Sequence, residues 1–290
     1  MPYFSVIIPA YNRKEKLKNA VDSVLAQDDK DFEIILVDDG SDDGTSALSS
    51  EYKQRIKYIY QENSGVSSAR NKGISSSSSP NITFLDSDDT WEKSKLRMHR
   101  EFIENNAGIL IHQTEDIWIR NGIKVNPGLR HLKPEGKIFI PSLELCLISP
   151  SSVCISKIIF DKYGLFDEKL PACEDYDLWL RITPFEKAGL IRKKLITRYA
   201  GHEDQLSSSF RAMDRFRLYS ILKLLHNSGD RLDAAYRDAA VNPALKKGKI
   251  LLNGMEKRGN STGSEKLLNI ISQVEAGFYM QTDYPTLLEI

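Results

Sequence analysis

The first 105 residues alternate short apolar runs with segments of helical spacing, and this alternation constrains the fold more than any other feature. The apolar runs are rich in β-branched and aromatic residues, which is typical of buried strands. They cover residues 3–8, 32–37, 57–60 and 82–85. Between the first two runs, apolar residues recur at helical spacing, as in Leu17, Ala20, Val21 and Val24. The alternation predicts an α/β fold with a mixed, mostly parallel sheet flanked by helices.

Three of the predicted strands end in residues suited to ligand binding. The first runs into Pro9 and Tyr11, the second into Asp38 and Asp39, and the fourth into the stretch Asp86–Asp89. In open α/β sheets, ligands bind beyond the carboxyl ends of the strands. We therefore expect these three chain segments to converge at one edge of the sheet.

The stretch Asp86–Asp89 places three carboxylates within four positions. Crowded carboxylates raise one another's pKa unless a cation neutralises them. Mg²⁺ and Mn²⁺ prefer oxygen ligands, and Mg²⁺ is usually held by one or two carboxylates together with substrate phosphates. One interpretation is a metal-diphosphate site. The alternative is a solvated acidic turn that caps a helix starting near Glu92, and the stretch alone does not decide between them.

Two further stretches point to a nucleotide. Asp39 can accept a hydrogen bond from a uracil imide or a ribose hydroxyl, although Asp and Gly are also common in ordinary βα turns. The segment Gly65–Gly73 opens a predicted helix whose N–H groups suit a phosphate, and Arg70 in it could grip one. The alternative for this segment is a surface helix with solvated cations.

Three acids, Glu174, Asp175 and Asp177, stand at the start of a predicted helix. One of them could serve as a general base. The helix dipole stabilises acids at this position without any catalytic role, so the structural interpretation stays open.

The second half of the chain has a different pattern. Apolar runs on both sides of Asn121-Gly122 predict a tight hairpin, and residues 190–199 predict a last strand. From about residue 207 onward the spacing is helical. We expect a catalytic domain over residues 1–205 and a helical extension over residues 206–290.

Composition narrows the function classes. Lys plus Arg and Asp plus Glu are 40 each among 290 residues, so no overall charge favours nucleic acid as a partner. Cys146, Cys154 and Cys173 lack zinc-type spacing and fit a reducing compartment. The first ten residues do not resemble a signal peptide, and no apolar run approaches the ~20 residues of a spanning helix. We expect a cytoplasmic protein.

Six stretches together resemble the family 2 glycosyltransferases of the GT-A fold, over about residues 3–205. They are Ser5–Asn12, Ile35–Ser41, Asn63–Gly73, Phe84–Trp91, Tyr163–Asp167 and Glu174–Arg181. The resemblance implies transfer of a sugar from a nucleotide diphosphate donor, usually with Mn²⁺ or Mg²⁺ and usually with inversion. Ser149–Val153 lacks the glycine often found in the family's acceptor-side loop, and residues 206–290 match no pattern of the family.

The resemblance also implies roles for single residues. Donor binding falls to Pro9, Tyr11, Asp39, Arg70 and Asp86, with Asp86 and Asp88 matching the D-x-D motif. Asp88 and Asp89 would hold the metal, joined by His202. Asp175 matches the general base, with Glu174 and Trp179 on the acceptor side.

The implied reaction is a single displacement with inversion, in which Asp175 takes a proton from an acceptor hydroxyl. Asp39 favours a uridine donor, with thymidine and guanosine left open. The acceptor would be a carbohydrate or a lipid-linked sugar in surface polysaccharide or glycolipid synthesis. The segment Phe210–Leu225 carries cations beside an apolar stripe, which leaves peripheral contact with the inner membrane face as an option.

Two other classes of protein compete with this interpretation. A sugar-nucleotide pyrophosphorylase would carry a basic, glycine-rich loop after the first strand, where this chain has Pro9–Asn12. A non-catalytic nucleotide-sugar-binding module would be expected to lose Asp88 or Asp175, and both are present.

Overall fold

The computed structural model describes residues 1–126, 128–201, 210 and 212–289. The chain forms two compact units, each built from more than one stretch of sequence. Unit 1 comprises Met1–Gly136, Leu147–Pro171 and Glu186–Glu203, and unit 2 comprises Lys137–Cys146, Ala172–Phe185 and Asp204–Ile290. The sequence predicted a single division after residue 205, whereas two earlier stretches, 137–146 and 172–185, also pack with the C-terminal helices.

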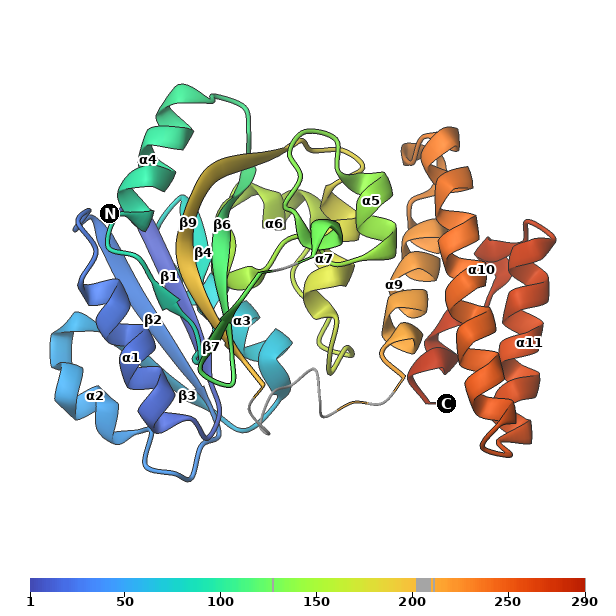
Figure 1. Cartoon of the computed structure of the whole chain (residues 1–290), viewed down its shortest axis with the longest axis horizontal. Helices are drawn as coiled ribbons and strands as arrows, with labels where there is room; N and C mark the ends of the chain where they lie inside the picture. Colours follow the sequence, from blue (N-terminus) through green and yellow to red (C-terminus); the bar gives the residue numbers. More distant parts are fainter. Residues whose placement is uncertain (127, 202–209, 211, 290) are drawn as a thin grey trace. The chain divides into compact units, whose positions relative to one another are not determined.

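Unit 1 is organised around a mixed sheet, whose described strands follow the order β3-β2-β1-β4-β8-β6-β9-β5, with β7 paired to β6 (Figure 1). The strands are β1 (Phe4–Ala10), β2 (Phe32–Asp39), β3 (Lys57–Gln61), β4 (Asn81–Phe84), β5 (Thr90–Trp91), β6 (Ile111–Arg120), β7 (Ile123–Val125), β8 (Val153–Ser156) and β9 (Ala188–Ala200). Strands β1 to β4 pair in parallel, as the alternation predicted. The pairs β4–β8, β6–β8, β5–β9 and β6–β7 are antiparallel.

The predicted hairpin at Asn121-Gly122 is confirmed. Arg120 pairs with Ile123 across the turn, and Asn121 and Gly122 have φ angles of 50° and 77°. Positive φ at both central positions is the geometry that matches the twist of two paired strands, and Asn-Gly adopts it readily.

Helices cover both faces of the parallel strands. They are α1 (Lys14–Leu25), α2 (Ala47–Tyr52), α3 (Gly65–Ser76), α4 (Lys95–Asn105) and α6 (Ile158–Tyr163). Successive side chains of a strand point to opposite faces. Phe4, Val6 and Ile8 of β1 pack in one cluster with the apolar stripe of α1. Ile7 points to the other face, where Gly73 of α3 lies against it.

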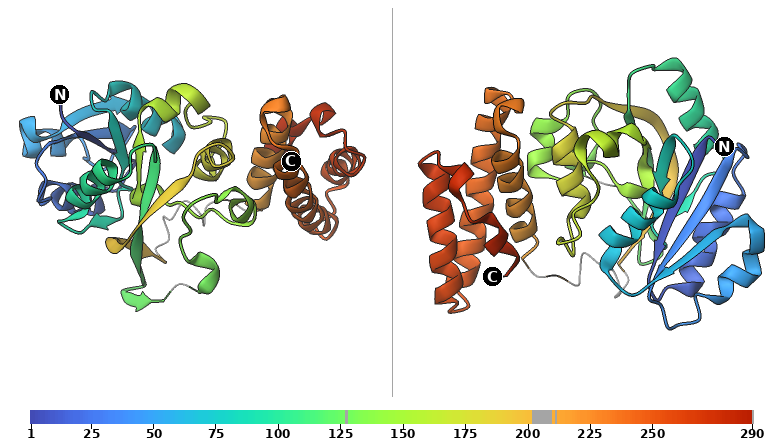
Figure 2. Two further views of the ribbon diagram at one scale, coloured as in Figure 1. Left: turned by 90° about the horizontal axis from the view of Figure 1, so that it is seen from above. Right: turned by 180° about the vertical axis from the view of Figure 1, so that it is seen from behind.

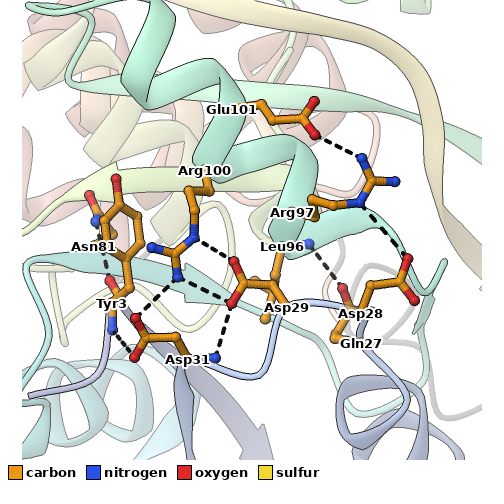
Figure 3. Close-up of polar contacts among 10 residues, drawn as sticks. All are labelled: Tyr3, Gln27, Asp28, Asp29, Asp31, Asn81, Leu96, Arg97, Arg100 and Glu101. Atoms are coloured by element: carbon orange, nitrogen blue, oxygen red, sulfur yellow. Dashed lines mark hydrogen bonds and ion pairs between the residues drawn. The ribbon is translucent and has the colours of Figure 1, made fainter.

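A charged network joins α4 to the start of β1 (Figure 3). Arg100 binds Asp29 through Nε and Nη2 and reaches Asp31 at 3.2 Å, and its guanidinium lies 3.9 Å from the centre of the Tyr3 ring. Asp31 in turn accepts a hydrogen bond from the Tyr3 backbone N–H at 3.1 Å. The network fixes the loop before β2 against α4.

Unit 2 consists of helices, of which α9, α10 and α11 lie side by side in both views of Figure 2. The helices are α5 (Phe139–Glu144), α7 (Glu174–Ile182), α9 (Asp214–Asn227), α10 (Ala234–Glu256) and α11 (Ser261–Glu275). The apolar stripe of α9 is buried, with Phe216, Ile221 and Leu225 each at most 1% exposed. That stripe therefore packs within unit 2 and is not open to lipid. Among the described helices, none combines the length and the apolar character needed to cross a bilayer.

We expect Gly73→Ala to destabilise unit 1. A Cβ at this position would lie 2.3 Å from Cγ2 of Ile7, a buried and conformationally stiff side chain. Overpacking of this kind costs about 1–3 kcal/mol, against about 1 kcal/mol gained in helix propensity. The matched control is Gly254→Ala in α10, where the new Cβ meets only the flexible end of Arg258 at 3.3 Å. Chemical denaturation would measure both, and a gain in stability for Gly73→Ala would contradict the packing.

We expect Arg100→Met to lower stability in a pH-dependent way. The hydrogen bond from Arg100 holds the pKa of Asp29 below its usual 3.8. A lowered folded-state pKa contributes stability above the unfolded pKa, and this contribution is lost as the pH falls. The variant should therefore be less stable by about 1 kcal/mol at pH 6, with a smaller difference near pH 3.

Arg97→Met serves as the control for this prediction. Its ion pair with Glu101 is about half exposed on both sides, so its removal should change stability by roughly 0.5 kcal/mol or less. If the difference in stability between the wild type and Arg100→Met stays constant from pH 6 to pH 3, the Asp29 carboxylate is not its cause.

Candidate active site

The ends of β1, β2 and β4 meet at one edge of the sheet, as the sequence predicted. The three strands are neighbours, and the register pairs Ala10 with Asp38 and Ile7 with Phe84. The candidate donor residues of unit 1 stand at these strand ends or, for Arg70, within α3.

Asp39, at the end of β2, is 4% exposed and organises the start of α3. Its carboxylate accepts hydrogen bonds from Gln61 Nε2 at 2.7 Å, from the Ser64 N–H at 2.9 Å and from the Gly65 N–H at 2.8 Å. A carboxylate offers about four lone-pair sites, so these three bonds leave little capacity for a ligand. In this structure Asp39 shapes the loop between β3 and α3.

Pro9 is buried as the penultimate residue of β1, whereas Tyr11 just beyond it is 49% exposed. Asn12 ties the loop after β1 to the loop after β2, because its N–H donates to Ser41 Oγ and its Oδ1 accepts from the Asp42 N–H, both at 2.9 Å. Asn12 has a φ of 49°, an uncommon conformation that these contacts fix. The loop that carries the exposed ring of Tyr11 is thus held in place by the hydrogen bonds of Asn12.

The acidic turn after β4 is not a solvated helix cap. Strand β5 follows it, and α4 begins only at Lys95, with Ser94 before it. Asp89 is 4% exposed, and the side chains of Asp86 and Asp88 are 30% and 13% exposed. The helix predicted to start near Glu92 was therefore placed too early, because Thr90–Trp91 pairs with β9.

Each carboxylate of the turn has a defined set of contacts. Arg70 Nη2 lies 2.7 Å from Asp86 Oδ1, and Arg13 Nη1 lies 2.7 Å from Asp88 Oδ2. The pKa of Asp89 is raised to about 8, chiefly by burial; the Arg198 cation opposes the rise, and the negative charges of Asp86 and Asp88 add to it.

The residue types of the turn suit a hard divalent cation. The donor set consists of carboxylate oxygens, which Mg²⁺ and Mn²⁺ prefer. Burial and two neighbouring acids disfavour the charged form of Asp89, and a divalent cation beside it would favour that form. His202, the third predicted metal ligand, lies outside the described residues.

The loop before β8 supports the turn from behind, a role that the sequence did not indicate. Ser151 is fully buried; its Oγ accepts from the Asp86 N–H at 3.1 Å, and its side chain also hydrogen-bonds Asp89. Trp91 Nε1 donates to the Ser151 carbonyl at 3.0 Å, and Lys95 Nζ donates to the Ser152 carbonyl at 3.2 Å. Ser151 is 65 residues from Asp86, so no local pattern could have linked them.

The predicted base and acceptor residues belong to unit 2, at the start of α7. Asp175 is partly exposed, and its carboxylate accepts from the Cys146 thiol at 3.3 Å and from the Tyr176 N–H at 2.7 Å. Asp177 is 1% exposed and paired with Arg181 at 2.9 Å and Lys223 at 3.1 Å. The Asp177 carboxylate is thus engaged by two cations inside unit 2.

The other two residues of this set are buried. Glu174 is 5% exposed, and Trp179 is 2% exposed. Burial of the Trp179 ring leaves almost none of its surface free for an acceptor in this structure.

The chain belongs to glycosyl transferase family 2, whose sequence profile matches residues 5–151. It is 34% identical over 185 residues to an uncharacterized glycosyltransferase of Rickettsia prowazekii (strain Madrid E), covering 62% of this chain and 58% of that protein. TuaG of Bacillus subtilis (strain 168), a glycosyltransferase named for teichuronic acid biosynthesis, is 42% identical over 106 residues, covering 35% of this chain and 42% of TuaG. The chain thus spans less than two thirds of the length of these curated relatives.

The predicted GT-A fold is confirmed by solved structures. Residues 1–349 of S. aureus TarS superpose with a TM-score of 0.69 at 18% identity, covering 99% of this chain and 90% of that one. The same TarS fragment in complex with UDP gives a TM-score of 0.70 at the same identity and coverage.

We expect Asp39→Ala to affect both folding and nucleotide binding. The substitution leaves the N–H groups of Ser64 and Gly65 without their acceptor, which costs about 1–3 kcal/mol for a buried site. Thermal melting should show this loss, and titration with UDP should show weaker binding because the loop changes shape. If the folded variant binds UDP as tightly as the wild type does, Asp39 is not part of the nucleoside pocket. Asp29→Ala, in the loop before β2, is the control for the effect on UDP binding of removing a carboxylate in the same unit.

Proposed function

We propose that this chain is a glycosyltransferase that transfers a sugar from a nucleotide diphosphate donor, with a UDP-sugar as the first choice. The observation that carries the proposal is the convergence of the loops after β1 and β2 with the acidic turn Asp86–Asp89 at one sheet edge. Family membership supports it, and so does the likeness in fold to TarS, for which structures in complex with UDP and UDP-GlcNAc exist.

The chain's own residues would bind the donor in a defined order along this edge. Tyr11 offers an exposed aromatic face for a base, and Asp39 holds the loop that frames it. Arg70, buried and paired with Asp86, would meet the phosphates through its planar fork.

Asp88 and Asp89, with His202, would hold Mn²⁺ or Mg²⁺, which when bound offsets the charge on the leaving diphosphate as a Lewis acid. The three acids of one turn, Asp86, Asp88 and Asp89, support this assignment.

Asp175 is the proposed general base for attack of an acceptor hydroxyl, with inversion at the sugar carbon. Burial raises the pKa of the Cys146 thiol well above its usual range, so the thiol stays protonated and can donate to Asp175. A helix N-terminus also favours an ionised carboxylate. Asp175 thus has a protonated thiol beside it and stands in the first turn of α7. Its rival Asp177 is enclosed by Arg181 and Lys223.

The acceptor is proposed to be a hydroxyl of a carbohydrate or a lipid-linked sugar, in the synthesis of a cell-surface polysaccharide. The name of TuaG supports this pathway class. The proposed location is the cytoplasm.

A screen of nucleotide sugars by thermal shift with Mn²⁺ tests the donor. A ligand present at about 100 times its Kd adds about 2.7 kcal/mol of stability. A glycosyltransferase should release nucleoside diphosphate when an acceptor or water takes the sugar. Release of a nucleoside triphosphate from the nucleotide sugar and pyrophosphate would instead identify a pyrophosphorylase, and binding without any turnover would identify a binding module.

We expect Asp175→Asn to lower turnover by about 10²–10⁴, the usual worth of general-base catalysis, while UDP binding stays unchanged. The substitution keeps the size of the side chain and removes its basicity. Asp238→Asn, at an exposed position of α10 in the same unit, is the matched control and should keep full activity. Near-normal turnover in Asp175→Asn together with an inactive Glu174→Gln would move the base to Glu174.

A further inference from the structure

Asp88, which the D-x-D motif offers to a metal, is held by an arginine from another element. Arg13 Nη1 lies 2.7 Å from Asp88 Oδ2, and the two side chains are only 17% and 13% exposed. At this distance the contact is a charge-assisted hydrogen bond, which is among the stronger kinds in proteins. The two residues are 75 positions apart in sequence, so the fold creates the pair.

The backbone around Arg13 is fixed, so the pair does not depend on a loose surface side chain. Strands β1 and β4 are parallel neighbours, which brings the residues after them to the same edge. Three hydrogen bonds tie the segment to the loop after β2: from the Asn12 N–H to Ser41 Oγ, from the Asp42 N–H to Asn12 Oδ1 and from the Lys14 N–H to Asp43 Oδ2.

Arg13 cannot give up its charge to make room for a second cation. A guanidinium stays protonated throughout the accessible pH range. The neighbouring Asp86 is already paired with Arg70 at 2.7 Å. A divalent ion on Asp88 would therefore face a fixed positive charge on the same carboxylate, and the two cations repel each other.

We propose that Arg13 and the divalent cation are competing partners of Asp88, so that Arg13 sets how tightly this site binds the cation. The inference rests on the proposed function, because that function supplies the cation. The proposed function also supplies a new partner for the Arg13 guanidinium once the cation displaces it from Asp88. The donor brings a diphosphate, whose oxygens are good partners for an arginine fork. The cation alone then binds weakly, and the donor raises its affinity.

The test is direct Mn²⁺ binding to the purified full chain, measured from the electron paramagnetic resonance signal of free Mn²⁺. Arg13→Gln should bind Mn²⁺ about tenfold more tightly than the wild type without nucleotide, within the 5–150-fold range of typical coupling. The gain in Mn²⁺ affinity caused by UDP should shrink in the variant, because Arg13→Gln has no guanidinium that the diphosphate could draw away from Asp88. Asp88→Asn should abolish binding.

Arg97→Gln is the matched control, since it removes an arginine from an ion pair elsewhere in unit 1 and should leave Mn²⁺ affinity unchanged. Circular dichroism would verify the fold of each variant. Arg13→Met, which keeps the aliphatic stem, replaces Arg13→Gln if the latter does not fold.

Two results overturn the inference in distinguishable ways. Wild-type Mn²⁺ binding that is lost in Asp88→Asn but unchanged or weaker in Arg13→Gln would make Arg13 a residue that positions Asp88. In that case the proposed glycosyltransferase site stands. Failure of the wild type and of Arg13→Gln to bind Mn²⁺, even with UDP, would remove the metal-donor site itself and the inference with it.

Discussion

The double pairing of β1 is the constraint on which the candidate donor site depends. All seven residues of this strand are buried, and it is hydrogen-bonded to β2 on one side and β4 on the other. A shift of its register by one residue would turn every side chain to the opposite face and break the packing of Ile7 against Gly73. The register therefore fixes where Asp39 and the turn Asp86–Asp89 emerge. The position of the chemical groups follows from apolar packing several residues away.

Electrostatic interactions then determine how Asp86, Asp88 and Asp89 can lie together in one turn. Three carboxylates in one turn would repel one another if they were left alone. Arginines from two different elements meet two of them, and burial raises the pKa of the third, Asp89, to about 8. With these partners the turn carries little net charge. This near neutrality explains why a strongly acidic sequence stretch can be buried, and it makes the arginines part of any description of the site.

The parallel strands and the β6–β7 hairpin could be predicted from sequence because their signals are local. Runs of apolar residues, helical spacing and the Asn121-Gly122 turn each lie within a few residues of chain. Long-range polar contacts carry no such signal. The pair Arg13–Asp88 could have been suspected only from the adjacency of β1 and β4, and the contact between Ser151 and Asp86 not at all.

The division of the chain shows the same limit for apolar contacts. Helical spacing located the helices after residue 207, but periodicity does not say what a helix packs against. α5 and α7 come from the middle of the sequence and nevertheless pack with α9 and α10. The burial of Trp179 in the described structure was likewise not visible in the sequence, because an exposed and a buried tryptophan look the same in a helical pattern.

The core behind the acidic turn contains ionisable groups where an apolar packing would be expected. Lys95 is fully buried and contacts His99 Nε2 at 2.7 Å, and His99 Nδ1 lies 2.9 Å from His112 Nε2. Burial lowers the pKa of all three side chains, so the fold favours their neutral forms.

Burying such a polar network costs free energy unless hydrogen bonds satisfy its members, and these bonds then rigidify the structure around them. Lys95 also donates to the carbonyl of Ser152, next to the serine that holds both ends of the acidic turn. Trp91 fixes the same loop from the Ser151 carbonyl. The chain of contacts runs from the buried histidines through Lys95 to Ser151 and then to Asp86 and Asp89. The polar core therefore contributes to the geometry of the site, and the position of the carboxylates depends on residues that no ligand would touch.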